Sequence, residues 1–167
     1  RFYKDKVPGE FKDETIKQFV IEQLVDNRLW LMAAKDMGIT VSDGDLREMI
    51  VQVPEFQKNG AFDPELYQRL LAANHLTPKI FEEAQAKEIL GNKARMFVRD
   101  AVALTPSEIS EGQALMTRQP DADPTKATAA KDRVLDDMLF QKQQRALVAF
   151  QESLKGKIPV KVHRELL

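Results

Sequence analysis

Hydrophobic positions recur along the chain at the spacing of α-helices over most of its length. The first such stretch begins at Asp13, a candidate N-cap, and runs to about Met37, with Gly38 at the expected C′ position. Two adjoining apolar stripes lie on it, one of Ile16, Phe19, Val20, Leu24 and Leu31 and one of Ile21, Val25, Leu29 and Met32. Because two stripes predict burial from more than one side, we expect this helix to be the central post of the fold.

Shorter helical patterns follow, separated by clear start and stop signals. Ser42 with Asp45 resembles a capping box, which predicts a short helix that Pro54 ends. Residues 54–64 are predicted to be an irregular loop with Asn-Gly at its turn. Three further helix starts place an N-cap residue before a proline: Asp63-Pro64, Thr77-Pro78 and Thr105-Pro106. The second of these helices is predicted to be long and to reach about Val102.

The C-terminal part has a different organisation. Residues 119–124 are polar with two prolines and predict a linker. A long helix follows and is predicted to end at about Lys155. Alternating apolar residues at 158–162 predict a short edge strand, whose pairing Pro159 restricts and for which residues 2–7 are the only nearby partner. The fold class is therefore all-α, with many helices, a long C-terminal helix and a short terminal β-strand.

The amino-acid composition excludes several classes of function. The 167 residues include no cysteine, which excludes disulfides, thiolate metal sites and a thiol nucleophile. Lys and Arg number 25 against 26 Asp and Glu, and this balance lacks the basic excess of a general nucleic-acid binder.

Candidate catalytic groups are sparse. The two histidines, His75 and His163, lie far apart and have no second ligand at a suitable spacing, so we expect a structural or solvent-exposed role for each. The carboxylate pairs, such as Glu82-Glu83, fall on predicted exposed faces, and the glycines are isolated. We therefore expect no catalytic residue, no metal and no cofactor.

The methionines and aromatic residues are the part of the composition that is most informative about function. The chain has six Met and nine Phe, spread over most of the predicted helices, and such side chains can line a surface that accepts many apolar partners. Core packing is the competing explanation for each of them taken singly. The residues that we place near a binding surface are Trp30, Met37, Met49, Phe56, Phe62, Tyr67 and Phe81.

Consecutive sequence pieces carry a family resemblance. Residues 24–29 and 33–43 are similar to a segment of pattern LIDxxLLxxxAxxxGIxVSD, and residues 54–63 to a loop of pattern PxFQxxGxFD. Residues 76–82 and 104–108 follow at the matching spacing. Together these pieces resemble the N-terminal domain of the SurA-like periplasmic chaperones, including the PpiD and PrsA type foldases, over about half of the chain.

The resemblance implies a domain organisation. Residues 1–118 would form the SurA N-terminal-like helical domain, and residues 119–124 would be the linker where the family inserts parvulin prolyl isomerase domains. Residues 125–167 would return as the long helix and edge strand that complete the same domain. A parvulin domain needs many more residues than this linker offers, so no isomerase activity is expected from the chain.

The resemblance also implies a function and a location. It points to an ATP-independent holdase core in the periplasm, which binds unfolded or extended segments of exported or outer-membrane proteins through an apolar groove. The signal segment would be absent from this sequence, and an N-terminal anchor outside it would place the protein close to a membrane.

Two alternatives remain open at this point. The chain would be a helical interaction module with one dedicated partner, or a homodimer that swaps its C-terminal helix. It would otherwise be the chaperone core of a prolyl isomerase whose parvulin domain is absent from this sequence.

Overall fold

Helices dominate the structure. The computed structural model describes residues 13–117, 124–159 and 161. These residues form six α-helices: α1 (Asp13–Asp36), α2 (Asp43–Gln52), α3 (Pro64–Ala73), α4 (Pro78–Asp100), α5 (Pro106–Thr117) and α6 (Pro124–Lys157). Between α2 and α3 lie the 3-10 helix η1 (Pro54–Phe56) and the two-residue strands β1 (Gln57–Lys58) and β2 (Ala61–Phe62). The predicted helical fold and its long C-terminal helix are confirmed.

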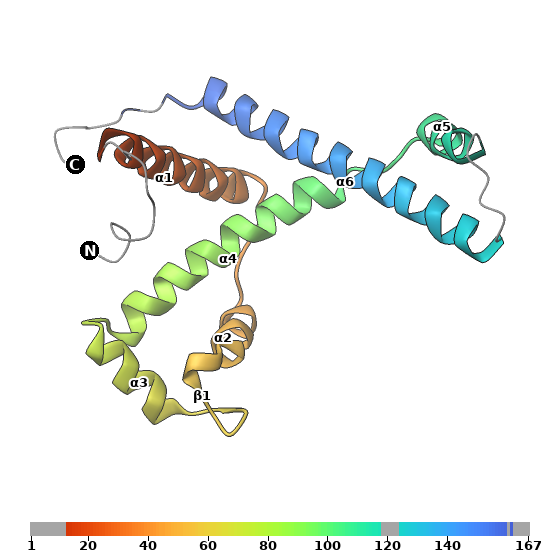
Figure 1. The fold of residues 1–167 in the computed structure, drawn as a ribbon. Helices are drawn as coiled ribbons and strands as arrows, with labels where there is room; N and C mark the ends of the chain where they lie inside the picture. Colours follow the sequence, from red (N-terminus) through yellow and green to blue (C-terminus); the bar gives the residue numbers. More distant parts are fainter. Residues whose placement is uncertain (1–12, 118–123, 160, 162–167) are drawn as a thin grey trace.

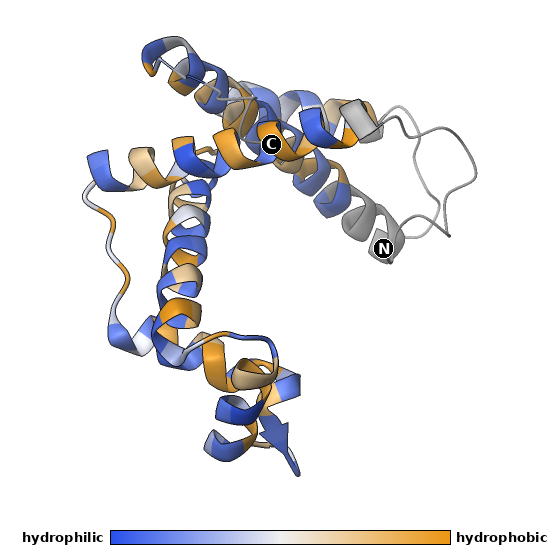
Figure 2. Ribbon diagram, turned by 90° about the vertical axis from the view of Figure 1, so that its left-hand side faces the viewer, coloured by the Kyte–Doolittle hydropathy of each residue, from blue (hydrophilic) through white to orange (hydrophobic). Residues whose placement is uncertain are grey.

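The elements gather in three regions along the long helices α4 and α6 (Figure 1). The crossing lobe consists of α1, the second half of α4 and the second half of α6, which pack on one another. The hairpin lobe consists of α2, η1, the β1–β2 hairpin, α3 and the first half of α4. The arm consists of α5 packed on the first half of α6 and extends away from both lobes. Figure 2 shows hydrophobic positions recurring among hydrophilic ones on the helices of all three regions.

The crossing lobe has its core where α1, α4 and α6 meet. Leu29 and Ala33 of α1 are buried against Leu154 of α6. On the neighbouring face, Trp30 and Ala34 are buried against Ala94 of α4. Alanines at the contact let the helices approach closely, and the first packing brings α1 and α6 together within one chain.

The hairpin lobe has a separate core. Ile50, Phe56, Tyr67 and Leu71 are its buried members, and they come from α2, η1 and α3. Phe81 of α4 packs against them, which attaches the small lobe to the long helix. No residue of this cluster belongs to the clusters of the crossing lobe.

Two lysines fasten the short helices to the long ones by the same arrangement. At α2, Ser42 and Asp45 form a capping box, and Lys93 of α4 donates to Asp45 Oδ2 at 2.7 Å and to the Thr40 carbonyl at 3.3 Å. At α5, Thr105 and Glu108 exchange the capping-box hydrogen bonds. Lys142 of α6 donates to Glu108 Oε2 at 2.7 Å and to the Ala103 carbonyl at 3.0 Å. We call each of these arrangements a lysine clamp.

Three expectations are corrected by the structure. Residues 54–64 are not an irregular loop, since they contain η1 and a hairpin that pairs Gln57 with Phe62 and turns at Asn59 and Gly60, both with positive φ. α1 is not a central post along its whole length, because its first half leaves large apolar side chains exposed. The helix α6 continues to Lys157, and Ile158, Pro159 and Lys161 are in neither helix nor strand.

Some predicted features lie outside the described residues. These are the partner segment at 2–7, most of the linker at 119–124, and Val160 and Val162 of the predicted strand.

Candidate functional site

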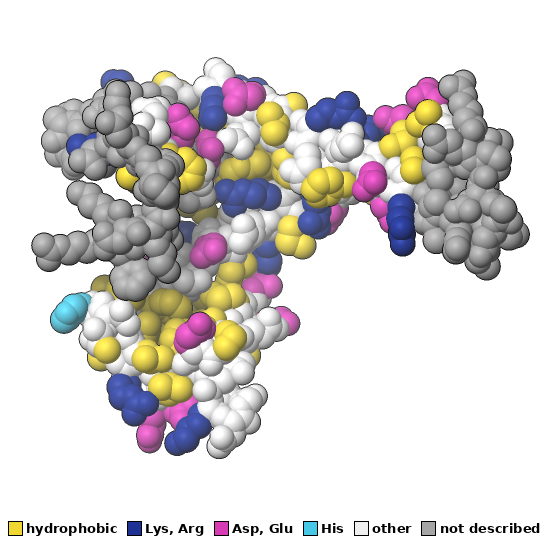
Figure 3. Space-filling model, in the orientation of Figure 1, with side chains coloured by type: hydrophobic (Ala, Val, Ile, Leu, Met, Phe, Trp, Pro, Cys, Tyr) yellow, Lys and Arg dark blue, Asp and Glu magenta, His cyan; other side chains and the backbone are white. Residues whose placement is uncertain are grey.

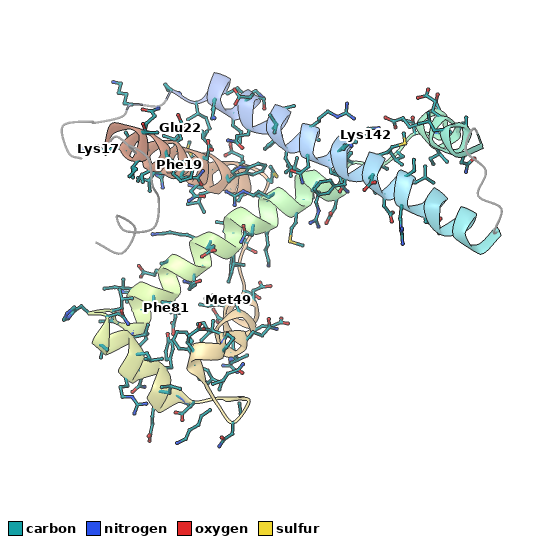
Figure 4. The ribbon with its side chains drawn as sticks, viewed as in Figure 1. Lys17, Phe19, Glu22, Met49, Phe81 and Lys142 are labelled. Atoms are coloured by element: carbon teal, nitrogen blue, oxygen red, sulfur yellow. The ribbon has the colours of Figure 1, made fainter. Side chains whose placement is uncertain are left out.

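Five of the seven residues predicted to lie near a binding surface meet in the hairpin lobe. Phe56 and Tyr67 are buried there, and Met49, Phe62 and Phe81 are half-buried around them. Their rings pack edge to face, with centroids 4.9 Å apart for Phe56 and Tyr67 and 5.6 Å apart for Phe56 and Phe81. Figure 4 labels Met49 and Phe81, which lie on α2 and α4 where the two helices border the same small lobe.

This aromatic cluster is first of all the core of a small lobe. Phe56 is 6% exposed and Tyr67 7%, so almost the whole surface of both side chains is used in packing within the lobe. The Tyr67 hydroxyl donates to Glu82 Oε1 at 3.2 Å. Burial, together with the nearby negative charge of Glu82, raises the pKa of Tyr67 to about 12, so the phenol stays protonated.

A cleft of about 540 Å³ borders this cluster. Phe62, Tyr67 and Pro78 supply apolar wall, while Asp43, Arg47 and Glu82 add charged groups. Figure 3 shows hydrophobic side chains in the hollow of the hairpin lobe, with charged residues interspersed around it.

The other two predicted residues lie in the crossing lobe. Trp30 is 2% exposed, with its ring centroid 5.4 Å from that of Phe150 and the Arg95 guanidinium 5.3 Å from the ring centre. Met37 is half-buried against the cluster of Leu29 and Leu154. The seven residues are therefore divided between two cores and do not form one continuous surface.

Among the residues whose burial the structure describes, the largest set of exposed apolar side chains on one helix lies on α1, where the sequence predicts burial. Ile16 is 48% exposed, Phe19 60%, Val20 43% and Leu24 59%, and we call these four residues the α1 stripe. Steps of three and four residues place them on one helix face. They lie on the half of α1 that diverges from α4, and Phe19 is labelled there in Figure 4.

The sequence shows that the α1 stripe is apolar but not that it is exposed. The first helix carries two adjoining apolar stripes, and a partner that covers one of them leaves the other exposed. The second stripe is covered over most of its length, since Leu29 is buried and Ile21 and Val25 are half-buried, whereas Met32 is 37% exposed.

A second cleft continues the stripe towards the crossing of α1 and α4. It has a volume of about 470 Å³ and is lined by Asn27 and Leu31 of α1 and by Lys87, Gly91 and Arg95 of α4, among others. Leu24 and Leu31 are seven residues apart and so share one face of α1. The exposed apolar stripe therefore leads directly into a cleft with polar and basic walls.

The described residues contain no group of three or more His, Asp or Glu side chains placed to hold a metal ion. Among the helices of this part of the chain, none is both long and apolar enough to cross a bilayer.

Comparisons with known proteins complete the description of the site. Residues 2–95 match the family model described as "SurA-like N-terminal domain". The periplasmic chaperone PpiD of Haemophilus influenzae is 37% identical over 62 residues, which are 37% of this chain and 10% of that protein. PpiD of Buchnera aphidicola is 32% identical over 76 residues, covering 46% and 12%. PpiD of Escherichia coli K12 is 24% identical over 117 residues, covering 70% and 19%.

The matched stretches thus span only a tenth to a fifth of these relatives. No solved structure matches the chain significantly.

Proposed function

The chain belongs to the family of SurA-like N-terminal domains, and from this premise we propose that it is the core of a periplasmic chaperone. In this role it holds unfolded or extended segments of exported and outer-membrane proteins without ATP. Family membership carries the proposal. The named relatives, which are periplasmic chaperones, support the compartment.

The α1 stripe is the structural feature that best fits client binding. Four large apolar side chains on one exposed helix face offer contact area to any apolar segment, without a shape that selects one sequence. Such contacts are individually weak and reversible, as a holdase requires, because each buried side chain contributes only about 1.5–3 kcal/mol.

The seven residues first placed near a binding surface contribute unequally to this proposal. Met49, Phe62 and Phe81 are half-buried and supply a secondary contact region in the hairpin lobe. Trp30, Phe56 and Tyr67 are buried, Met37 is half-buried in the crossing lobe, and these four act by supporting the two lobes.

The proposal treats residues 1–118 and 125–167 as one domain. Its support is that α6 packs on α1 and α4 of the same chain. The proposal assigns no isomerase activity to this domain, and catalysis of a proline-limited refolding reaction by the purified chain would contradict that part.

Suppression of aggregation tests the holdase activity. An unfolded outer-membrane protein is diluted from denaturant with and without the chain, and light scattering is followed. We expect the chain to lower the scattering and Phe19→Ser to weaken this effect. Phe140→Ser is the matched control, since Phe140 of α6 is also 60% exposed but lies away from the α1 stripe.

The possible results separate the models. A chain that neither suppresses aggregation nor binds peptide contradicts the holdase. Equal loss in both variants contradicts the α1 stripe as the contact surface. Protection of one client only, with no competition from unrelated unfolded proteins, favours a module with one dedicated partner.

A further inference from the structure

The cleft between α1 and α4 contains an arginine with unusual neighbours. Arg95 Nη2 donates to Asn27 Oδ1 of α1 at 3.1 Å, and Nη1 donates to Asn92 Oδ1 of its own helix at 3.1 Å. Its guanidinium also lies over the Trp30 ring, 5.3 Å from the centre. The side chain is therefore held in place from two helices.

Both hydrogen-bond partners of Arg95 are neutral amides. Among the described residues, Arg95 takes part in no ion pair, although Lys93, Arg99, Lys142 and Lys155 do. A guanidinium has five N–H donors, and two of them are used here. A fixed positive charge with unused donors thus borders a cleft of about 470 Å³.

The rest of the cleft adds a second cation and open space. Lys87 lies two turns before Arg95 on α4 and lines the same cleft. Glu88 is the acidic residue that lines the cleft, and Asp26 of α1 and Glu88 both act electrostatically on the Arg95 guanidinium. Gly91 lies between the two basic residues, where a Cβ would come within 3.4 Å of Arg95 Nη1. Its lack of a side chain leaves room in the cleft beside the guanidinium.

From this geometry we propose that the α1–α4 cleft binds a carboxylate group of a client polypeptide, through Arg95 with Lys87. The guanidinium fork matches the two oxygens of a carboxylate, and such charge-assisted bonds are stronger than neutral ones. The amide groups of Asn27 and Asn92 line the same cleft and can bond to the backbone beside that carboxylate.

This inference rests on the proposed holdase function and makes it more specific. The α1 stripe leads along one helix face to the cleft, so an extended segment can place apolar side chains on the stripe and a carboxylate in the cleft. That carboxylate would be either the C-terminus of the client or an Asp or Glu side chain.

Isothermal titration calorimetry with four short apolar peptides tests the proposal. The peptides share one sequence and have a free C-terminal carboxylate, a C-terminal amide, an amide with one internal Glu, or an amide with Gln at that position. We expect the free-carboxylate peptide, the Glu peptide or both to bind about tenfold more tightly than their neutral counterparts, as for one charge-assisted hydrogen bond. Which peptide gains affinity identifies the source of the carboxylate.

Three variants locate the effect in the cleft. Arg95→Gln is expected to remove the tenfold preference, and Lys87→Gln to reduce it while leaving the stack on Trp30 intact. Arg145→Gln is the matched control, because Arg145 is exposed on α6 and donates to the Gln141 carbonyl of its own helix. If Arg95→Gln does not fold, the Lys87→Gln variant alone tests whether the cleft is the source of the preference for a carboxylate.

The outcomes that overturn the inference differ from those that overturn the holdase. If all four peptides bind wild type equally, the carboxylate site is wrong and the holdase stands. A preference that survives in the Arg95 and Lys87 variants, or falls equally in Arg145→Gln, also overturns the site. Failure of every peptide to bind overturns both proposals.

Discussion

At the scale of single residues, glycine at position 112 sets how closely α5 approaches α6. Gly112 is buried, and a Cβ built on it would lie 2.8 Å from Leu135 Cδ2 and 2.9 Å from Met138 Sδ. Both neighbouring atoms belong to side chains of α6. A larger residue would force them to move or push the two helices apart, so the packing of the arm depends on this one missing side chain.

A Gly112→Ala substitution is therefore expected to weaken the packing of α5. Overpacking of this kind costs about 1–3 kcal/mol, and the roughly 1 kcal/mol that alanine gains over glycine in a helix offsets part of it, so we expect a net loss of stability of up to about 2 kcal/mol. The measurement is urea unfolding combined with limited proteolysis of α5. Gly44→Ala is the control, since a Cβ there meets only Ser42 Oγ at 3.5 Å and should leave stability equal or slightly higher. A stabilised Gly112→Ala protein would contradict the close contact.

At the scale of elements, the lysine clamps decide where the short helices attach. Each clamp joins a capping-box carboxylate to a lysine of a long helix, at 2.7 Å in both cases. The same lysine donates to a carbonyl two residues before the N-cap. One side chain thus fixes both the first turn of a short helix and the connection that leads into it.

The attachment of α5 to α6 depends on pH because of the lysine clamp at Glu108. Lys142, together with the Thr105 backbone and hydroxyl, lowers the pKa of Glu108 from its ordinary value of 4.5 to about 2. Because the folded-state pKa is the lower one, the clamp contributes fully above about pH 4.5. That contribution is lost as the pH falls towards 2.

Amide hydrogen exchange of α5 measured from pH 6 downward tests this dependence. The measured rates are divided by the intrinsic exchange rates at each pH. We expect protection of α5 to fall between about pH 4.5 and pH 2 in wild type, whereas Glu108→Gln should be less protected at pH 6 and change less. Glu111→Gln, on the same helix and exposed, is the control and should follow wild type. An acid transition of equal size in Glu108→Gln would contradict the clamp.

Sequence patterns predicted these elements well where a local signal exists. The capping pairs Ser42 with Asp45 and Thr105 with Glu108 marked the starts of α2 and α5, because the residues that form a capping box are close in sequence. The clamping lysines Lys93 and Lys142 could not be recognised, since they lie 48 and 34 residues from their carboxylate partners. The β1–β2 hairpin was missed because two-residue strands are too short to show alternation.

At the scale of the whole molecule, the two lobes have separate cores joined by α4. Phe56, Tyr67 and Ile50 fill the hairpin lobe, whereas Trp30 and Leu29 fill the crossing lobe. A long helix that passes from one core to the other allows each lobe to lose stability by itself. The lobes are thus candidates for separate unfolding units.

Phe56→Ala is expected to destabilise the hairpin lobe and to leave the crossing lobe largely unchanged, which hydrogen exchange can measure. Removal of a buried ring costs about 3–5 kcal/mol, and this loss should appear as faster exchange in α2 and α3. Exchange in the second halves of α4 and α6 should change little. Phe97→Ala is the control, because Phe97 is 61% exposed and its removal should change stability by no more than about 0.5 kcal/mol. Equal acceleration in both lobes would show a single cooperative unit.

The candidate site was predictable only in part. Aromatic residues at 56, 62, 67 and 81 were among the seven residues predicted to lie near a binding surface, and the structure packs these four together in one core. The pattern of one helix does not tell which of its apolar faces finds a partner, so the exposed α1 stripe was taken for buried. Arg95 went unnoticed because Asn27, which binds it across the cleft, is 68 residues away in sequence.

The position of the Lys142 clamp also determines how α5 responds to a pulling force. Lys142 holds the first turn of α5, next to Glu108, while the chain leaves the helix at its other end after Thr117. A load applied beyond Thr117 therefore peels α5 from α6 contact by contact, and the ion pair bears tension last. The ion pair at the start of the helix is then expected to be the last contact between α5 and α6 to break.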